Sequence, residues 1–354
     1  MHREVDVAAE VRSQDLTVPR KRRQPLARGL TLQKISLKPE FFLKKKLHFY
    51  TIPMKANMEI GNQDQPAFKI RLSCPTGLSP SQVSVDFGQV YDRIPHPDVN
   101  LENSISEIWD QRVQKNASLF NGLKFRYGGH SFSGGAGTDQ EPHVCLHLGL
   151  TDYRTFVGTN LNPLWERFLL PSEDDFRQCQ HTSSPLGNGA VIETSDKKII
   201  VLQRSKNVGE FPGHYVFPGG HPEPEEIRIS SHDNRDDNSH QIMKEKLSQE
   251  MFDSITREVV EEIGVPADSL TKPAFIGISR RVLNVRPTAF FFMTCSLQSM
   301  EIQQLYHSAA DGYESTQLYA ASMDDLESMA KKMPGCHQGG FALFKLMIDA
   351  AKDA

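Results

Sequence analysis

Three glutamates fall within five residues in the segment REVVEEIGV, residues 257–265. A helix places Glu258 and Glu262 one turn apart on one face, with Glu261 a fraction of a turn away. Like charges at this spacing repel one another, and a bound divalent cation removes that cost. Carboxylate oxygens are hard ligands, which favour Mg²⁺ or Mn²⁺. The segment therefore predicts a metal-binding helix face, with a solvated acidic face as the alternative.

The helix that must carry these glutamates is amphipathic. Apolar residues recur at every fourth position, at Leu247, Met251, Ile255 and Val259. This spacing forms one apolar stripe along a helix, and the carboxylates lie along its edge. The helix ends at Gly264, which is followed by Val265 and Pro266. We expect the stripe to pack on a core and the acidic edge to face a ligand.

A glycine-rich loop, VFPGGHPEPEE at residues 216–226, precedes the helix. Loop and helix together resemble the Nudix box, G-x5-E-x7-R-E-U-x-E-E-x-G-U, where U is a bulky aliphatic residue. The right half matches from Arg257 to Val265 and the left half from Gly220 to Glu226. Between the halves, 30 residues (227–256) stand where the pattern has 7. Counting back from Arg257 without a gap places Gln249 at the first glutamate position, with Glu250 beside it, so the residue in that role is left open.

The resemblance implies an α/β fold, the Nudix α/β/α sandwich with a mixed sheet, for a hydrolase domain at residues 187–354. The sequence patterns agree with this order of elements. Strands are predicted at 187–193, 198–202, 275–278 and 289–295, and helices at 324–331 and 341–351. The polar segment 228–241 is predicted to be a mobile loop.

A smaller N-terminal α+β domain is predicted at residues 58–170, contributing to a nucleotide pocket. Its expected strands are 68–72, 83–87, 123–127 and 144–148. A capping box at Ser104–Glu107 predicts a helix that runs to about Gln114. The segment 150–160 suits a ligand-facing turn or, equally, a packed surface turn. We place the domain linker at 170–186, where the sequence is polar and contains Pro and Ser.

Three further motifs resemble one branch of the Nudix superfamily, the UDP-glucose/UDP-galactose pyrophosphatases. They are L-F-x-x-x-K-F at 119–125, L-G-L-T-x-Y-R-x-F-x-G-T-N at 148–160, and Y-E-S-T at 313–316. The similarity covers about Met58 to the C-terminus. It implies hydrolysis of a UDP-sugar to UMP and sugar 1-phosphate with Mg²⁺, or alternatively Mn²⁺. We assign Glu258 and Glu262 as metal ligands, and Glu261 as a third or water-mediated ligand.

The remaining site residues are assigned to the substrate. Arg204 is the predicted phosphate clamp, because a guanidinium binds two phosphate oxygens at once; the alternative is a surface arginine. Gly219 and Gly220 would let the backbone approach the helix closely. On the resemblance, His221 and Glu223 hold ribose or sugar hydroxyls.

Two aromatic residues and one loop glutamate complete the predicted site. Phe120 and Tyr153 are candidates to sandwich the uracil ring, and core packing is the alternative for each. Glu314 is the predicted general base, ahead of Glu261, with a plain surface glutamate as the alternative. We expect Arg257 to orient a ligand carboxylate and not to act on substrate.

Charge is distributed unevenly along the chain. Residues 1–57 carry 13 Lys+Arg against 5 Asp+Glu, whereas the rest carries 27 against 39, so the whole-chain charge of −4 combines +8 with −12. The basic segment is expected to be a disordered extension, and its PRKRR run at 19–23 is the alternative, a nuclear-import or polyanion patch. Five scattered cysteines and the absence of a long apolar run predict a cytoplasmic protein with no membrane span.

Several other functions compete with UDP-sugar hydrolysis. Residues 203–205 and 213–220 also resemble coenzyme A pyrophosphatases, and ADP-ribose is a third candidate substrate. A non-catalytic nucleotide-sugar sensor would keep the fold, but the complete set of glutamates argues against it. The acidic charge of the folded part disfavours mRNA or other nucleic-acid partners. Glucose versus galactose preference, the number of metals and the oligomeric state are left open by the sequence.

Overall fold

The computed structural model describes residues 66–117, 119–134, 141–206, 208, 210–232, 237–306 and 315–353, with side chains omitted for 237–241. All of these belong to one compact unit, residues 47–354. The basic extension predicted for residues 1–57 and the predicted base Glu314 lie outside the described residues. No helix in the described ranges is both long and apolar enough to cross a membrane.

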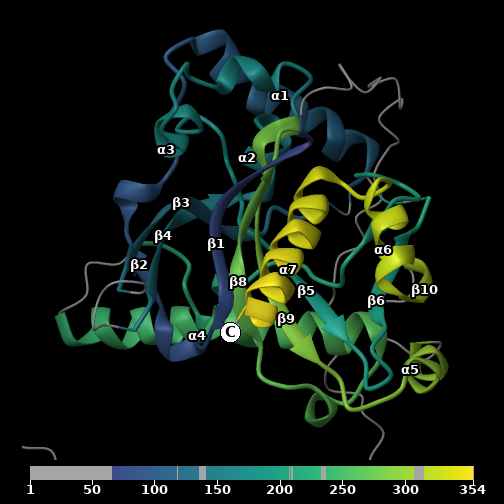
Figure 1. The fold of residues 1–354 in the computed structure, drawn as a ribbon. Helices are drawn as coiled ribbons and strands as arrows, with labels where there is room; N and C mark the ends of the chain where they lie inside the picture. The colour runs from purple at the N-terminus through teal and green to yellow at the C-terminus, as the bar shows by residue number, and fades with distance from the viewer. Residues whose placement is uncertain are drawn as a thin grey trace, which may run out of the picture. The chain divides into compact units, whose positions relative to one another are not determined.

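A mixed seven-stranded sheet forms the centre of the unit (Figure 1). Its strand order is β1 (Phe68–Leu78), β8 (Ala274–Arg281), β9 (Pro287–Thr294), β5 (Gly187–Glu193), β6 (Ile199–Arg204) and β10 (Ser315–Ala321), with β7 (Tyr215–Val216) also paired to β6. Strands β5 and β9 are parallel, and the other pairs are antiparallel. The predicted strands of the hydrolase domain are therefore present, and β10 begins where the sequence predicted a loop.

Helices cover both faces of this sheet. Helix α4 (Asp237–Ile263) packs on one face, and α6 (Met323–Ala330) and α7 (Gly335–Asp353) pack on the other (Figure 1). Side chains of β5 alternate between the two layers: Ala190 and Ile192 join the α4 core, and Val191 joins the α7 core. A shorter helix, α5 (Ser299–Tyr306), contacts α4. This arrangement is an α/β/α sandwich and confirms the predicted fold class.

A second, three-stranded sheet is formed by the N-terminal part of the chain. Its order is β2 (Val83–Phe87), β4 (His143–Asp152) and β3 (Leu123–Ser133), with β2 parallel to β4 and β3 antiparallel to it. Its apolar side chains, such as Val85 and Leu146, join the same core as α4. The accompanying helices are α1 (Val99–Lys115), α2 (Tyr153–Gly158) and α3 (Asp175–Gln178).

Short 3-10 helices occur at six places among the described residues. They are η1 (Pro80–Gln82), η2 (Gln89–Tyr91), η3 (Trp165–Phe168), η4 (Pro224–Ile227), η5 (Ala267–Ser269) and η6 (Leu283–Val285). Of these, η4 lies in the glycine-rich loop region that leads towards α4. It marks the start of the insertion inside the Nudix box.

The predicted start of α1 is wrong. The helix begins at Val99, where the Asp98 side chain accepts hydrogen bonds from the amides of Asn100 and Leu101. Ser104 lies inside the helix, and its hydroxyl donates to the carbonyl of Leu101. An aspartate N-cap satisfies the free amides of the first turn, so the serine–glutamate pair is not needed as a cap. Asp98 and Ser104 are both residue types that cap helices, and the sequence pattern alone does not show that Asp98 is the cap.

The domain bounds 58–170 and 187–354 stay a prediction, but the structure contains two features that cross them. Strand β1 belongs to the large sheet, where it pairs with β8. Residues 181–190 are buried, although 170–186 was predicted to be a linker. The segment 150–160 is likewise packed, because it forms the end of β4 and α2. Asn160 is fully buried, and its side-chain amide donates to the Asn284 carbonyl at 2.8 Å.

Candidate active site

The Gly-Gly loop contacts the two predicted metal ligands directly. The amide of Gly219 donates to Glu262 Oε2 at 2.8 Å. A Cβ atom added to Gly220 would lie 2.3 Å from Glu258 Oε1. Position 220 therefore has no room for a side chain while Glu258 keeps its place. The structure thus places the two loop glycines beside two helix glutamates that follow about 40 positions later in the sequence.

Asn188 at the start of β5 fixes this loop. Its side-chain Oδ1 accepts from the Gly220 amide at 2.7 Å, and its own amide donates to the Gly220 carbonyl at 3.0 Å. Its Nδ2 donates to Ser254 Oγ on α4 at 2.9 Å. Gly219 has φ +157°, and a Cβ there would lie 2.3 Å from the Asn188 carbonyl oxygen. No sequence pattern indicated Asn188, because its role depends on three segments that meet only in the fold.

Glu250, one of the two residues near the unassigned first glutamate position, contacts both Arg257 and the glycine-rich loop. Its carboxylate Oε1 accepts from Arg257 Nη2 at 2.7 Å and from the Glu223 amide at 3.2 Å. Burial raises the pKa of Glu250 despite the nearby Arg257, and the side chain is almost fully buried. The adjacent Gln249 is exposed and instead bonds Asp253. Arg257 therefore ties α4 to the glycine-rich loop through Glu250, one residue later than the ungapped pattern indicates.

His221 and Glu223, the predicted sugar ligands, are held by residues from other parts of the fold. Glu223 pairs with Lys124 of β3 at 3.0 Å. His221 Nε2 lies 2.7 Å from Arg286 Nη2. Burial lowers the pKa of His221 well below its usual range, and the charges of Arg286 and Lys124 lower it further. Because Arg286 donates to Nε2, the neutral imidazole of His221 carries its proton on Nδ1. It can therefore donate a hydrogen bond from Nδ1.

Arg204 lies in a cluster of three arginines around Glu210. Its Nε donates to the Glu210 backbone carbonyl at 2.9 Å, and the Glu210 carboxylate pairs with Arg281 and, at 3.0 Å, with Arg286. Burial alone would raise the pKa of Glu210, but the charges of Arg281 and Arg286 hold it at about 2. Three guanidiniums thus face one carboxylate, which leaves excess positive charge. In the described part of the chain, the buried Nε of Arg286 has no hydrogen-bond partner.

The two aromatic candidates lie in adjacent segments but in different surroundings. The Tyr153 amide donates to the Gly122 carbonyl at 3.0 Å, which places Tyr153 beside the segment of Phe120. The Tyr153 ring packs edge-to-face against Trp109, with ring centroids 5.9 Å apart. The Phe120 side chain is 53% exposed. Their joint role around a uracil ring stays a prediction.

The glutamates supply carboxylate oxygens of the type that bind a divalent cation. Among the described residues, no group of three or more His, Cys, Asp or Glu side chains is gathered as a ready-made metal cage. Glu258, Glu261 and Glu262 are each half-buried on the last turns of α4. A pair of carboxylates fits Mg²⁺, which keeps several waters and is bound through one or two carboxylates together with substrate phosphates. The donor set is therefore compatible with the predicted cofactor.

Known proteins similar to this chain include several Nudix hydrolases. Nudix hydrolase 9 of Arabidopsis thaliana is 62% identical over 294 residues, which is 82% of this chain and 94% of that protein. Uridine diphosphate glucose pyrophosphatase NUDT22 of Mus musculus is 34% identical over 71% of this chain and 80% of its own length. The Homo sapiens protein of the same name is 31% identical over 75% and 86%.

The chain belongs to the Nudix hydrolase family, and the predicted family and enzyme class are confirmed. Members of this family generally use divalent metal ions. No protein-family model matches the chain. The solved MutT protein from Methanosarcina mazei Go1 is 17% identical, with a TM-score of 0.29 over 45% of this chain and 91% of that one. The assignment rests on the sequence relatives and not on this likeness.

Proposed function

We propose that this Nudix hydrolase cleaves the diphosphate bond of a UDP-sugar, UDP-glucose or UDP-galactose, and releases UMP and sugar 1-phosphate. The observation that carries the proposal is the contact of Gly219 and Gly220 with Glu262 and Glu258. It provides paired carboxylates beside backbone that a ligand can approach closely. The printed names of the NUDT22 relatives, at 31–34% identity, support the choice of substrate.

Glu258 and Glu262 would hold Mg²⁺, with Glu261 as a third or water-mediated ligand. When bound, such a cation neutralises phosphate charge and lowers the pKa of a bound water. Arg257 acts through Glu250 and keeps the helix and loop in register. Glu261 and Glu314 are the candidates for the base that takes a proton from the attacking water.

The arginine cluster supports recognition of a diphosphate. Arg204 and Arg286 belong to a group in which positive charges outnumber the single carboxylate of Glu210. Guanidinium groups bind phosphate oxygens in pairs, and buried positive charge favours an anionic ligand. In this arrangement His221 donates through Nδ1, Glu223 accepts a sugar or ribose hydroxyl, and Phe120 and Tyr153 border the uracil.

The test is product analysis with the full chain. Purified protein is incubated with Mg²⁺ and UDP-glucose, UDP-galactose, ADP-ribose or coenzyme A, beside Glu258→Gln and Glu262→Gln variants. We expect UMP and sugar 1-phosphate from the parent, a loss of at least a hundredfold in each variant, and no turnover after chelation of the metal. Unchanged thermal unfolding of the variants shows that the fold is intact.

The same experiment separates the competing functions. Turnover of coenzyme A or ADP-ribose without turnover of UDP-sugars would reject the proposed substrate and keep the proposed metal site. Binding of UDP-glucose without release of UMP would indicate a sensor. Full activity of the Glu258→Gln and Glu262→Gln variants would reject the metal ligands.

A further inference from the structure

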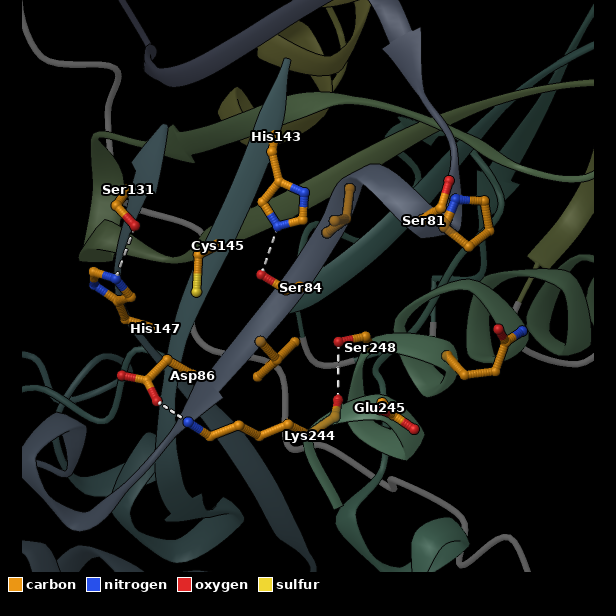
Figure 2. Close-up of a pocket in the computed structure, with 14 residues that line it drawn as sticks. Ser81, Ser84, Asp86, Ser131, His143, Cys145, His147, Lys244, Glu245 and Ser248 are labelled. Atoms are coloured by element: carbon orange, nitrogen blue, oxygen red, sulfur yellow. Dashed lines mark hydrogen bonds and ion pairs between the residues drawn. The ribbon is translucent and has the colours of Figure 1, made fainter. Parts of the chain in front are cut away.

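A half-open cavity of about 610 Å³ lies at the β2 edge of the three-stranded sheet, where the polar face of the sheet meets the N-terminal half of α4 (Figure 2). Its volume is within the range of small-molecule sites, roughly 300–1,000 Å³. Gln249 of α4 lines it, nine residues before Glu258. At 1.5 Å per residue this separates the cavity from the metal-binding turn by about 13 Å along the helix. The cavity is therefore distinct from the proposed active site.

The cavity walls carry polar groups that are already oriented. Alternation along β2 and β4 turns Ser84, Asp86 and His143 towards the cavity (Figure 2). Ser84 Oγ lies 2.8 Å from His143 Nε2, and Lys244 Nζ of α4 donates to Asp86 Oδ1 at 2.8 Å. Tyr91 donates its hydroxyl to the second Asp86 oxygen at 2.6 Å. These bonds hold both walls in place without filling the space between them.

The charge of the lining disfavours anions. Two carboxylates, Asp86 and Glu245, face one ammonium group, Lys244. Nucleotides and sugar phosphates would meet net repulsion here, so the cavity does not suit the substrate or products of the proposed reaction. Both Asp86 oxygens already accept strong hydrogen bonds. An organic cation would therefore have to displace Lys244 or Tyr91.

Most lining groups both donate and accept hydrogen bonds. They include the hydroxyls of Ser81, Ser84, Ser131 and Ser248, the imidazoles of His143 and His147, and the amide of Gln249. Such groups complement ligand hydroxyls, which also donate and accept. We propose that this cavity binds an uncharged polyhydroxyl molecule of the monosaccharide class.

The cavity and the active site share one helix. Gln249 faces the cavity, and the next residue, Glu250, holds Arg257 and the Glu223 amide. An occupant would contact α4 directly at Lys244 and Ser248. We therefore expect bound monosaccharide to slow hydrogen exchange in residues 242–250, a readout that does not require catalysis.

The test is titration of the full chain with free D-glucose or D-galactose, followed by saturation-transfer NMR and hydrogen exchange. Ser248→Trp fills the cavity, and Lys246→Trp places the same ring on the exposed face of the same helix. We expect saturable binding in the parent and in Lys246→Trp, and at least tenfold weaker binding in Ser248→Trp. A milder variant, Ser84→Ala, should weaken binding several-fold if the larger substitution disturbs folding.

Two outcomes would overturn the proposal. One is no saturable binding of either hexose by the parent, and the other is equal affinity in Ser248→Trp and Lys246→Trp. The Glu223→Ala variant distinguishes this site from the active site, because it removes a proposed sugar ligand of the active site and should still bind free hexose. Stronger protection of residues 242–250 by glucose 1-phosphate than by glucose would also count against the site.

Discussion

At the scale of single residues, Glu258 can occupy its position only because Gly220 has no Cβ atom. An added Cβ would lie 2.3 Å from Glu258 Oε1, and the carboxylate is the flexible end of its side chain. In Gly220→Ala we therefore expect the carboxylate to move and the backbone to stay. Turnover should fall at least tenfold, while the unfolding temperature changes by only a few degrees. Steady-state kinetics and calorimetry on the same preparation measure both effects.

Gly88→Ala is the matched control for this substitution. A Cβ at position 88 would meet only Val90 Cγ1, at 3.8 Å, which is ordinary van der Waals contact, and the backbone there is extended. We expect nearly unchanged turnover from this variant. Equal activity of Gly220→Ala and the parent would show that Glu258 does not need its observed position.

Glu250 and Gln249 provide a second test at residue scale. Glu250→Ala removes the buried acceptor of Arg257 and of the Glu223 amide. The free energy of unfolding should fall by about 2–3 kcal/mol, since an unpaired, partly buried arginine remains. Gln249→Ala, at the exposed neighbouring position, should change it by less than about 0.5 kcal/mol. Chemical denaturation of both variants measures the difference, and similar losses would contradict the assigned pair.

How far the sequence predicted the site differs from residue to residue. Gly220, Glu258 and Glu262 were assigned because their roles follow from a local pattern on one loop and one helix. Arg281 and Arg286 were missed, because their link to Arg204 runs through Glu210 and exists only once β6 and β8 belong to one sheet. Glu250 was left open because the insertion breaks the spacing of the pattern.

At the scale of elements, α7 contributes a buried histidine to the loop that carries the two glycines. His337 Nδ1 accepts from the Phe217 amide at 3.1 Å, and the ring packs near Phe217 and Phe290. Burial, with the charge of Arg204, lowers the pKa of His337 to about 3. An unfolded chain binds a proton at this residue below about pH 6.5, whereas the folded protein does not.

This pKa predicts a defined pH dependence of stability. The contribution of neutral His337 is complete above about pH 6.5 and is lost as the pH falls towards 3, by about 1.4 kcal/mol per pH unit. His337→Asn keeps an acceptor for the Phe217 amide and removes the titration. Its stability should therefore fall less steeply between pH 6.5 and 5 than that of the parent. An equal loss of unfolding free energy in both proteins between pH 6.5 and 5, measured by chemical denaturation, would contradict this account.

The insertion in the Nudix box also has a role at element scale. It includes most of α4, and it contacts the N-terminal part of the chain through one ion pair and one histidine–carboxylate hydrogen bond. Lys244 pairs with Asp86 at 2.8 Å, and His232 pairs with Asp92 at 2.9 Å while stacking on Phe87. The insertion therefore joins the N-terminal sheet to the helix of the glutamates. The Lys244–Asp86 pair is exposed, and exposed ion pairs contribute little to the free energy of unfolding. Its main effect is therefore to hold the two segments in position.

At the scale of the whole molecule, the two predicted domains share a sheet and a core. Strand β1 pairs with β8 and contacts α7, and Leu72 and Leu78 are buried in the core that contains α4. A chain that begins at residue 187 would leave the β8 edge unpaired and this core open to water. We expect it to aggregate or to unfold without a cooperative transition.

The measurement for this prediction is thermal unfolding of the 187–354 fragment beside a chain that begins at residue 58. The longer chain retains β1 and should unfold cooperatively and hydrolyse substrate. Cooperative unfolding of the fragment with activity intact would instead support two independent domains. The comparison also tests the sequence-based domain bounds directly.

The sequence by itself determined the family resemblance and the paired glutamates, because these depend on short-range spacing: a glycine loop, a four-residue apolar repeat, and carboxylates one helical turn apart. The sandwich followed from the resemblance. Alternation likewise located most strands. Tertiary structure alone decided that β1 completes the hydrolase sheet, that Glu250 holds Arg257, and that three arginines meet at Glu210. These contacts join residues whose separation in sequence carries no periodic signal, so only the packed sheet and core bring them together.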